Sequence, residues 1–79
     1  MTKYLVIYEQ GDDGAWGAYS PDLEGAFALG RTRAEVEARM HEAVTAYVEV
    51  MREDGLPIPE PCHHADYIAV PAAVPERRP

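Results

Sequence analysis

The residue types best suited to metal binding lie close together near the C-terminus. Cys62, His63 and His64 are consecutive and Asp66 follows, whereas His41 lies far away in the sequence. Thiolate, imidazole and carboxylate groups are the ligands that Zn²⁺ takes in proteins. However, the spacing matches no C-x₂-C or H-x₃-H pattern, and three adjacent residues cannot easily point at one ion. We therefore expect no metal site and interpret the segment as a solvated loop.

The sequence also lacks the usual arrangements of a catalytic nucleophile or a cofactor site. Cys62 precedes His63, but a catalytic pair needs side chains that converge, which neighbours in an extended loop do not do. Ser20 lies outside any G-x-S-x-G motif, and the glycines form no G-x-G-x-x-G or phosphate-loop pattern. We predict no catalytic residue and no cofactor. One cysteine allows no intrachain disulfide, which favours a reducing cytoplasm.

Carboxylates are concentrated in two short segments that flank predicted strands. Asp12 and Asp13 lie in one segment, and Asp22 and Glu24 lie in the other. Such a group could hold Mg²⁺ in a metal-dependent nuclease. Asp12-Asp13-Gly14 is, however, typical of turn chemistry. We therefore favour contacts with a basic protein partner and keep a degenerate nuclease as a less favoured alternative.

Composition narrows the class of partner. The chain has 79 residues and a formal net charge of −7, which argues against nucleic-acid and anionic-membrane ligands. Four aromatic residues, Tyr4, Tyr8, Trp16 and Tyr19, lack the basic groove of a stacking platform for single strands. No apolar run approaches the roughly 20 residues of a membrane span. A domain this small has a marginal core, and oligomerisation would stabilise it.

Hydrophobic patterning predicts three strands and a long helix. Tyr4 to Tyr8 is apolar on both faces, which is typical of a central strand covered on both sides. A glycine-rich polar loop then leads into a strand over 15–19, which Pro21 ends. A third strand is expected over 26–29. Together the three strands should form an antiparallel meander.

The helix is expected from Arg33 to Asp54. Thr32 and Glu35 have the spacing of a capping box, and apolar residues then recur on one helical face. Gly55 is a suitable residue to end the helix. Prolines at 57, 59 and 61 predict a stiff extended connector, after which 67–70 is expected to form a fourth strand.

The order of elements predicts an α+β fold, a single β-β-β-α-β domain. Its mixed four-stranded sheet would be covered on one face by one long helix, with a right-handed crossover to the last strand. The opposite face would carry either the Tyr4/Val6/Tyr8 set or the Leu5/Ile7 set. Because no element remains to cover it, we expect this face to be an interface, in a homodimer or homotetramer.

Several short motifs match a known family in both order and spacing. They are Tyr4-Leu5-Val6-Ile7-Tyr8, Asp13-Gly14-x-Trp16-x-Ala18, Ser20-Pro21-Asp22-Leu23-x-Gly25, Gly30-x-Thr32-x-x-Glu35, Glu42-Ala43-x-x-x-Tyr47 and Gly55-x-Pro57-Ile58-Pro59-x-Pro61. With these motifs the chain resembles the HicB-like antitoxin family of bacterial type II toxin–antitoxin systems. The resemblance implies a partial ribonuclease-H-like domain over 1–70 with strand order 3-2-1-4. Residues 71–79 would be a proline-rich tail.

The resemblance also implies a function. Such antitoxins bind and neutralise a HicA-type toxin, a small basic ribonuclease that cleaves mRNA, and are not themselves enzymes. Many members continue into a C-terminal DNA-binding domain. Only nine residues follow Val70 here, so we do not expect direct DNA binding by this chain. The alternative is an orphan homo-oligomeric scaffold or regulatory protein.

The predicted protein interface combines the apolar first strand, the aromatic residue of the second strand and the acidic loops. Its residues are Tyr4, Val6, Tyr8, Asp12, Asp13, Trp16, Asp22 and Glu24.

Overall fold

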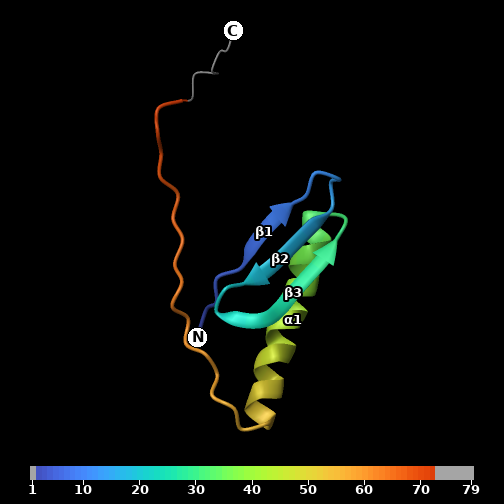
Figure 1. Cartoon of the computed structure of the whole chain (residues 1–79), viewed down its shortest axis with the longest axis vertical. Coiled ribbons are helices and arrows are strands. Elements are labelled where there is room, and N and C mark those ends of the chain that lie inside the picture. Colours follow the sequence, from blue (N-terminus) through green and yellow to red (C-terminus); the bar gives the residue numbers. More distant parts are fainter. Residues whose placement is uncertain (1, 73–79) are drawn as a thin grey trace.

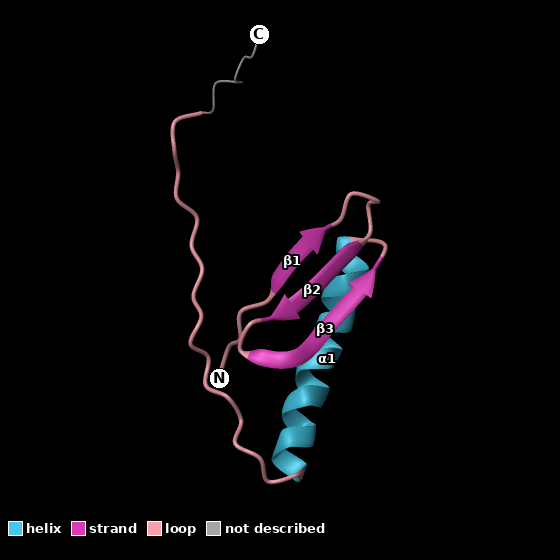
Figure 2. Ribbon diagram, in the orientation of Figure 1, coloured by secondary structure: helices cyan, strands magenta, loops and turns pink. Residues whose placement is uncertain are grey.

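The computed structural model describes residues 2–72. Within them lie the strands β1 (Ile7–Gln10), β2 (Trp16–Ser20) and β3 (Leu23–Gly30) and the helix α1 (Arg33–Glu53). The strands form one sheet in the order β1-β2-β3 with both pairs antiparallel, which confirms the predicted meander. The helix packs across one face of the sheet, and the chain after it runs as an extended connector (Figures 1 and 2).

A tight turn joins β1 to β2. Gly14 has a φ of 87°, in the left-handed region that glycine adopts without steric cost. The Gly11 amide donates to the Ala15 carbonyl at 2.8 Å, and the Ala15 amide donates to Asp13 Oδ1 at 3.0 Å. Asp13 therefore stabilises the turn through its own side chain, as an aspartate in such a loop commonly does.

Both ends of α1 are capped. Thr32 Oγ1 accepts from the Glu35 amide at 3.1 Å, as predicted. Glu35 reaches back one residue further than a standard capping box, because its Oε1 accepts from the Arg31 amide at 2.7 Å. At the other end, the Leu56 amide donates to the Met51 carbonyl at 2.9 Å and Gly55 has a φ of 71°. These contacts form a Schellman motif.

The core lies between the sheet and α1. Its fully buried large side chains are Leu23, Val36 and Met40. Ala18 and Ala28 pair across β2 and β3 and are both buried beneath the helix. Tyr8 and Trp16 are partly buried and pack against this core cluster.

The predicted four-stranded mixed sheet is wrong: within residues 2–72 the sheet has three strands and no fourth pairs with β1. Tyr67 and Ile68 are 99% and 83% exposed in an extended segment that leaves the domain. The prolines of the connector explain this, because they hold the chain extended and lack amide donors for a ladder. A four-residue strand before Pro71 would add few hydrogen bonds in return.

The predicted central position of the first strand is also wrong. β1 begins at Ile7 instead of Tyr4 and lies at an edge of the sheet. Ile7 pairs with Tyr19, so two more residues of the same ladder would place Leu5 opposite Pro21. Pro21 has no amide hydrogen, and the pairing stops before it.

The predicted tail over 71–79 falls largely outside the described residues, which end at 72. None of the helices described is both long enough and apolar enough to cross a membrane.

Candidate protein-interaction surface

The face of the sheet opposite α1 carries large apolar side chains that remain exposed. Ile7 pairs with Tyr19, and Tyr19 pairs with Phe27, so the three form one row across all three strands. Phe27 is 63% exposed, and Leu29, two residues along β3, is 66% exposed. These four residues, Ile7, Tyr19, Phe27 and Leu29, are called the open face below.

Alternation along β3 produces the open face. In the run Ala26-Phe27-Ala28-Leu29, the two alanines are buried under α1 while Phe27 and Leu29 point to the other side. Successive residues of a strand face opposite sides of the sheet. A sheet stabilised only by its own core would place its large apolar residues inside. Here Phe27 and Leu29 are exposed instead, and exposed apolar patches of this kind are common at protein interfaces.

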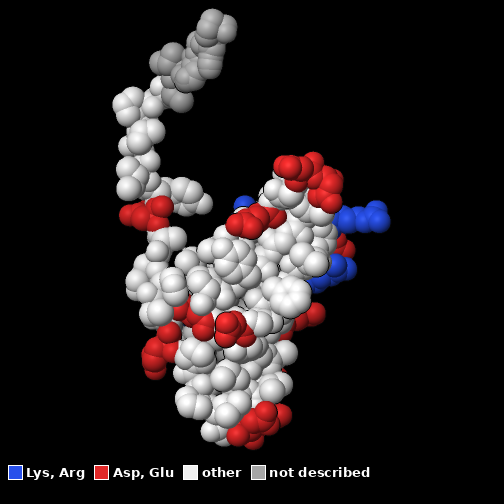
Figure 3. Space-filling view, viewed as in Figure 1, with Lys and Arg blue, Asp and Glu red and all other residues white. Residues whose placement is uncertain are grey.

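Acidic side chains surround this apolar surface. Asp12 and Asp13 are exposed in the β1–β2 turn, and Glu24 is exposed on β3. In the view that looks onto the sheet, uncharged atoms cover much of the surface, acidic groups lie at the turn and at several places on the face and its edge, and a few basic groups lie along one side (Figure 3). The predicted acidic contacts at these three residues are therefore accessible.

The remaining predicted interface residues lie elsewhere. Tyr4, Val6, Tyr8 and Trp16 are partly buried against the core cluster, on the side of the sheet that faces α1. The Tyr4 hydroxyl donates to the Pro59 carbonyl at 2.7 Å, which attaches the N-terminal segment to the connector. Whether any of them contacts a partner stays a prediction; their observed contacts are within the chain.

Asp22 differs from the other acidic residues because its side chain is only 1% exposed. Its Oδ1 accepts from Cys62 Sγ at 3.0 Å and lies 2.6 Å from His63 Nδ1. The hydrogen bonds from Cys62 and then from His63 hold the pKa of Asp22 well below its usual range. Asp22 therefore attaches the connector to the β2–β3 corner, and its predicted contact with a partner stays a prediction.

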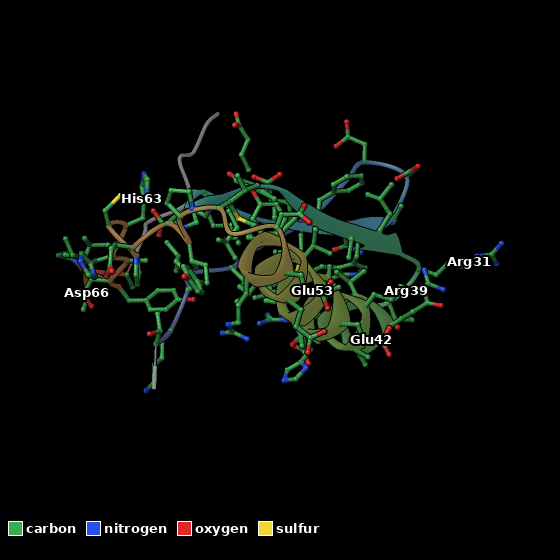
Figure 4. The ribbon with its side chains drawn as sticks, turned by 90° about the horizontal axis from the view of Figure 1, so that it is seen from below. Arg31, Arg39, Glu42, Glu53, His63 and Asp66 are labelled. Atoms are coloured by element: carbon green, nitrogen blue, oxygen red, sulfur yellow. The ribbon has the colours of Figure 1, made fainter. Side chains whose placement is uncertain are left out.

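This cluster brings together three side chains with metal-ligating atoms. The ligand atoms of Asp22, Cys62 and His63 all lie within 4.8 Å of one another. The carboxylate of Asp22 raises the pKa of the Cys62 thiol, so the thiol is less reactive than a free cysteine and a poor nucleophile. His63 and Asp66 lie on the connector, away from Arg31 and Arg39 at the other end of the domain (Figure 4). Asp66 is not part of the cluster of Asp22, Cys62 and His63; its carboxylate accepts a hydrogen bond from the Tyr67 amide at 2.8 Å.

A shallow hollow of about 570 Å³ lies between α1 and the connector. Its apolar lining comes from Tyr4, Val44, Val48, Ile58 and Pro59. Glu49 and Arg52 are also at its wall, so its lining is mixed.

Sequence reasoning missed the open-face residues of β3 and the contact of Asp22 with the connector. The alternation of alanine with phenylalanine and leucine was a usable signal, because it separates small from large residues by side of the strand. No comparable signal linked Asp22 to Cys62 and His63, which are 40 and 41 residues away in the chain.

The amino-acid sequence of this chain is similar to those of known proteins. A family model described as the HicB_like antitoxin of bacterial toxin–antitoxin systems matches residues 4–74. The UPF0150 protein Ta0767 of Thermoplasma acidophilum is 35% identical over 57 residues, which cover 72% of this chain and 83% of that protein. The UPF0150 protein ssr1765 of Synechocystis is 30% identical over 60 residues, 76% of each chain.

Two solved structures share the fold. The N-terminal domain of the Burkholderia pseudomallei antitoxin HicB superposes with a TM-score of 0.66 at 24% identity, over 75% of this chain and 69% of that chain. A HicA3 and HicB3 toxin–antitoxin complex contains a chain that superposes with a TM-score of 0.63 at 28% identity, over 77% of this chain and 70% of that chain.

Proposed function

This chain belongs to the HicB-like antitoxin family of bacterial toxin–antitoxin systems, and on that premise we propose that it binds a HicA-type toxin and neutralises it directly. The family favours a binding role without catalysis. A related chain is part of a HicA3 and HicB3 complex, which supports a toxin as the partner.

The observation that carries the proposal is the open face. Phe27 and Leu29 expose most of their side chains to water, while alanines fill the buried side of the same strand. Aromatic residues such as Phe are enriched at protein interfaces, and apolar area that a partner removes from water favours binding. The open face therefore supplies the apolar centre of the proposed toxin interface.

Acidic residues around the open face supply the polar rim. Asp12, Asp13 and Glu24 are exposed, and the chain as a whole carries a net charge of −7. This negative charge accelerates the encounter with a basic nuclease, because opposite charges attract. It also disfavours association with acidic proteins, because like charges repel. A protein that covers the basic surface of a ribonuclease also excludes RNA from it, so binding alone accounts for neutralisation.

Co-expression tests the proposal. The proposal predicts a small ribonuclease gene next to that of this protein. That gene is placed under separate control, and growth is followed with and without this chain. We expect the toxin alone to stop growth and the pair to restore it, with both proteins eluting together after purification. Absence of both rescue and complex would contradict the proposal.

A pair of variants localises the contact. Phe27→Thr with Leu29→Thr removes the apolar centre while keeping residues that suit a strand. Val50→Thr is the matched control, because Val50 is also exposed, at 54%, but lies on α1. We expect rescue to be lost in the double variant and retained in the control.

We further propose self-association through the extended segment 67–70, instead of through the sheet face opposite the helix that the sequence suggested and that we assign to the toxin. Tyr67, Ile68 and Val70 are all largely exposed, and an extended segment cannot bury its own side chains. A second copy of the chain would cover them, giving a homodimer or homotetramer. Light scattering on the chain alone should give a mass above the monomer, which falls to the monomer mass with Tyr67→Ser and Ile68→Ser. A monomer in the unmodified protein contradicts this proposal and leaves the toxin proposal unaffected.

A further inference from the structure

Three ligand types converge from two segments that are far apart in the chain. Asp22 belongs to the corner between β2 and β3, and Cys62 and His63 belong to the connector after α1. We propose that Asp22, Cys62 and His63 form a binding site for Zn²⁺ that joins the corner to the connector. The site is independent of the proposed toxin interface, which lies on the open face.

One of the three separations between ligand atoms already suits a tetrahedral ion, and the other two are shorter. Usual Zn–S and Zn–N lengths put a sulfur and a nitrogen ligand about 3.5 Å apart around a tetrahedral centre. Cys62 Sγ and His63 Nδ1 are 3.5 Å apart. The Asp22 oxygen is closer, at 3.0 Å from the sulfur and 2.6 Å from the nitrogen. Those two distances are hydrogen-bond lengths. To admit a tetrahedral ion, the sulfur–oxygen distance needs to open by about 0.6 Å and the nitrogen–oxygen distance by about 0.8 Å.

The hydrogen bonds define where the ion would lie. The Cys62 thiol donates to Asp22 Oδ1, and His63 Nδ1 lies at hydrogen-bond distance from the same oxygen. Zinc binding removes the thiol proton, which is released to water. Any proton on His63 Nδ1 is likewise released to water, and the ligating neutral imidazole carries its one proton on Nε2. One divalent ion then takes the place of the hydrogens that now lie between the three groups.

The donor set selects the metal class. One thiolate, one imidazole and one carboxylate match the mixed ligands that Zn²⁺ accepts. Mg²⁺ and Ca²⁺ take oxygen ligands, so the thiol disfavours them. Cys62 is exposed and the His63 side chain is 53% exposed, which leaves room for water as a fourth ligand.

Burial of Asp22 separates this cluster from an incidental surface group. Its side chain is 1% exposed, so one ligand is already fixed by the fold before the ion arrives. The amide of His63 also donates to Asp22 Oδ2 at 3.3 Å, which holds the connector backbone next to the carboxylate. A fixed ligand lowers the ordering cost of binding.

Metal titration of the full chain tests the site. Cd²⁺ or Co²⁺ is added to the reduced protein, and the thiolate-to-metal charge-transfer absorption is followed together with Zn²⁺ competition. We expect one ion per chain and Zn²⁺ displacement of the probe. Because the chain has a single cysteine, bound Zn²⁺ should also slow alkylation of Cys62, which mass spectrometry measures.

Variants identify the ligands. Cys62→Ser and His63→Ala change exposed residues outside the buried core, and each should weaken Zn²⁺ binding by at least about tenfold. His64→Ala is the matched control, because His64 is adjacent in sequence but is not part of the cluster. Its affinity should stay within about twofold of the unmodified chain.

Two results would overturn the proposal. The first is Zn²⁺ binding that His64→Ala weakens as strongly as His63→Ala does, which indicates an adventitious ion held by the connector histidines. The second is the absence of charge-transfer absorption with unchanged alkylation, which indicates that hydrogen bonds alone attach the connector to the corner.

Discussion

The two faces of the sheet have opposite compositions. On the side of α1, Ala18, Ala26 and Ala28 are buried. On the other side, Tyr19, Phe27 and Leu29 are exposed, although they belong to the same two strands. Along 26–29 of β3 the covered side carries alanines and the open side carries Phe27 and Leu29, although the covered face also holds Leu23 and Trp16.

The two faces of the sheet contribute to different properties, the covered face to folding stability and the open face to the proposed binding of a partner. A residue buried under α1 contributes to folding through the apolar area that it removes from water. A residue on the open face gains that contribution only when a partner arrives. In a domain of this size, with few large buried side chains, the open face therefore represents apolar area available for a partner, and the two faces should respond differently to the same substitution.

The largest expected difference is between two leucines of β3. Leu23→Ala should lower the free energy of unfolding by about 2–5 kcal/mol, because Leu23 is fully buried and the change leaves a cavity. Leu29→Ala, on the open face, should change it by no more than about 0.5 kcal/mol. Urea denaturation followed by circular dichroism measures both. Equal losses in the two variants would abolish the distinction between the faces.

A smaller effect is expected at the start of the helix that covers one face. Thr32→Ala removes the acceptor for the Glu35 amide and should cost about 1 kcal/mol of unfolding free energy. Thr45→Ala is the matched control, since Thr45 is exposed within α1 and caps nothing. A thermal midpoint that falls in the control as much as in Thr32→Ala would exclude capping as the cause.

The smallest effect concerns pH. The Arg31 amide, and then the charge of Arg39, lower the pKa of Glu35. Because the folded pKa lies below the unfolded value of about 4.3, the ionised form stabilises the fold above that pH, and the contribution is lost as the pH falls through the folded pKa.

Glu35→Gln keeps an acceptor for the Arg31 amide but cannot ionise. Its stability should lie slightly below that of the unmodified chain near neutral pH, and the two should converge in acid. Denaturation midpoints from pH 7 to pH 3 measure the difference. A constant offset across this range would show that Glu35 acts through its shape alone.

Local signals predicted the elements well and their long-range arrangement less well. Thr32, Glu35 and Gly55 defined both ends of α1, because caps depend on neighbouring residues. The apolar run Tyr4 to Tyr8 led to a central strand, but the pairing partner of Leu5 would be Pro21, and this conflict depends on register. The segment 67–70 has a strand-like composition, yet its pairing would depend on where the prolines before it carry the chain.

The candidate surface shows the same limit. Exposure of Asp12, Asp13 and Glu24 followed from their place in loops and strand ends. Asp22 also lies in a loop between two strands, so its sequence neighbours do not distinguish it from the exposed acidic residues. Its carboxylate is nevertheless buried by the connector, about 40 residues later in the chain. Contacts at that separation are set by tertiary packing, for which one sequence carries no local pattern.

The most direct test of the open face as the toxin-binding surface is the affinity of the double variant Phe27→Thr with Leu29→Thr for its toxin, measured by titration calorimetry. We expect binding at least about tenfold weaker than that of the unmodified chain, with an unchanged unfolding midpoint, and Val50→Thr binding as the unmodified chain does. Unchanged affinity in the double variant would contradict the assignment of toxin binding to this face.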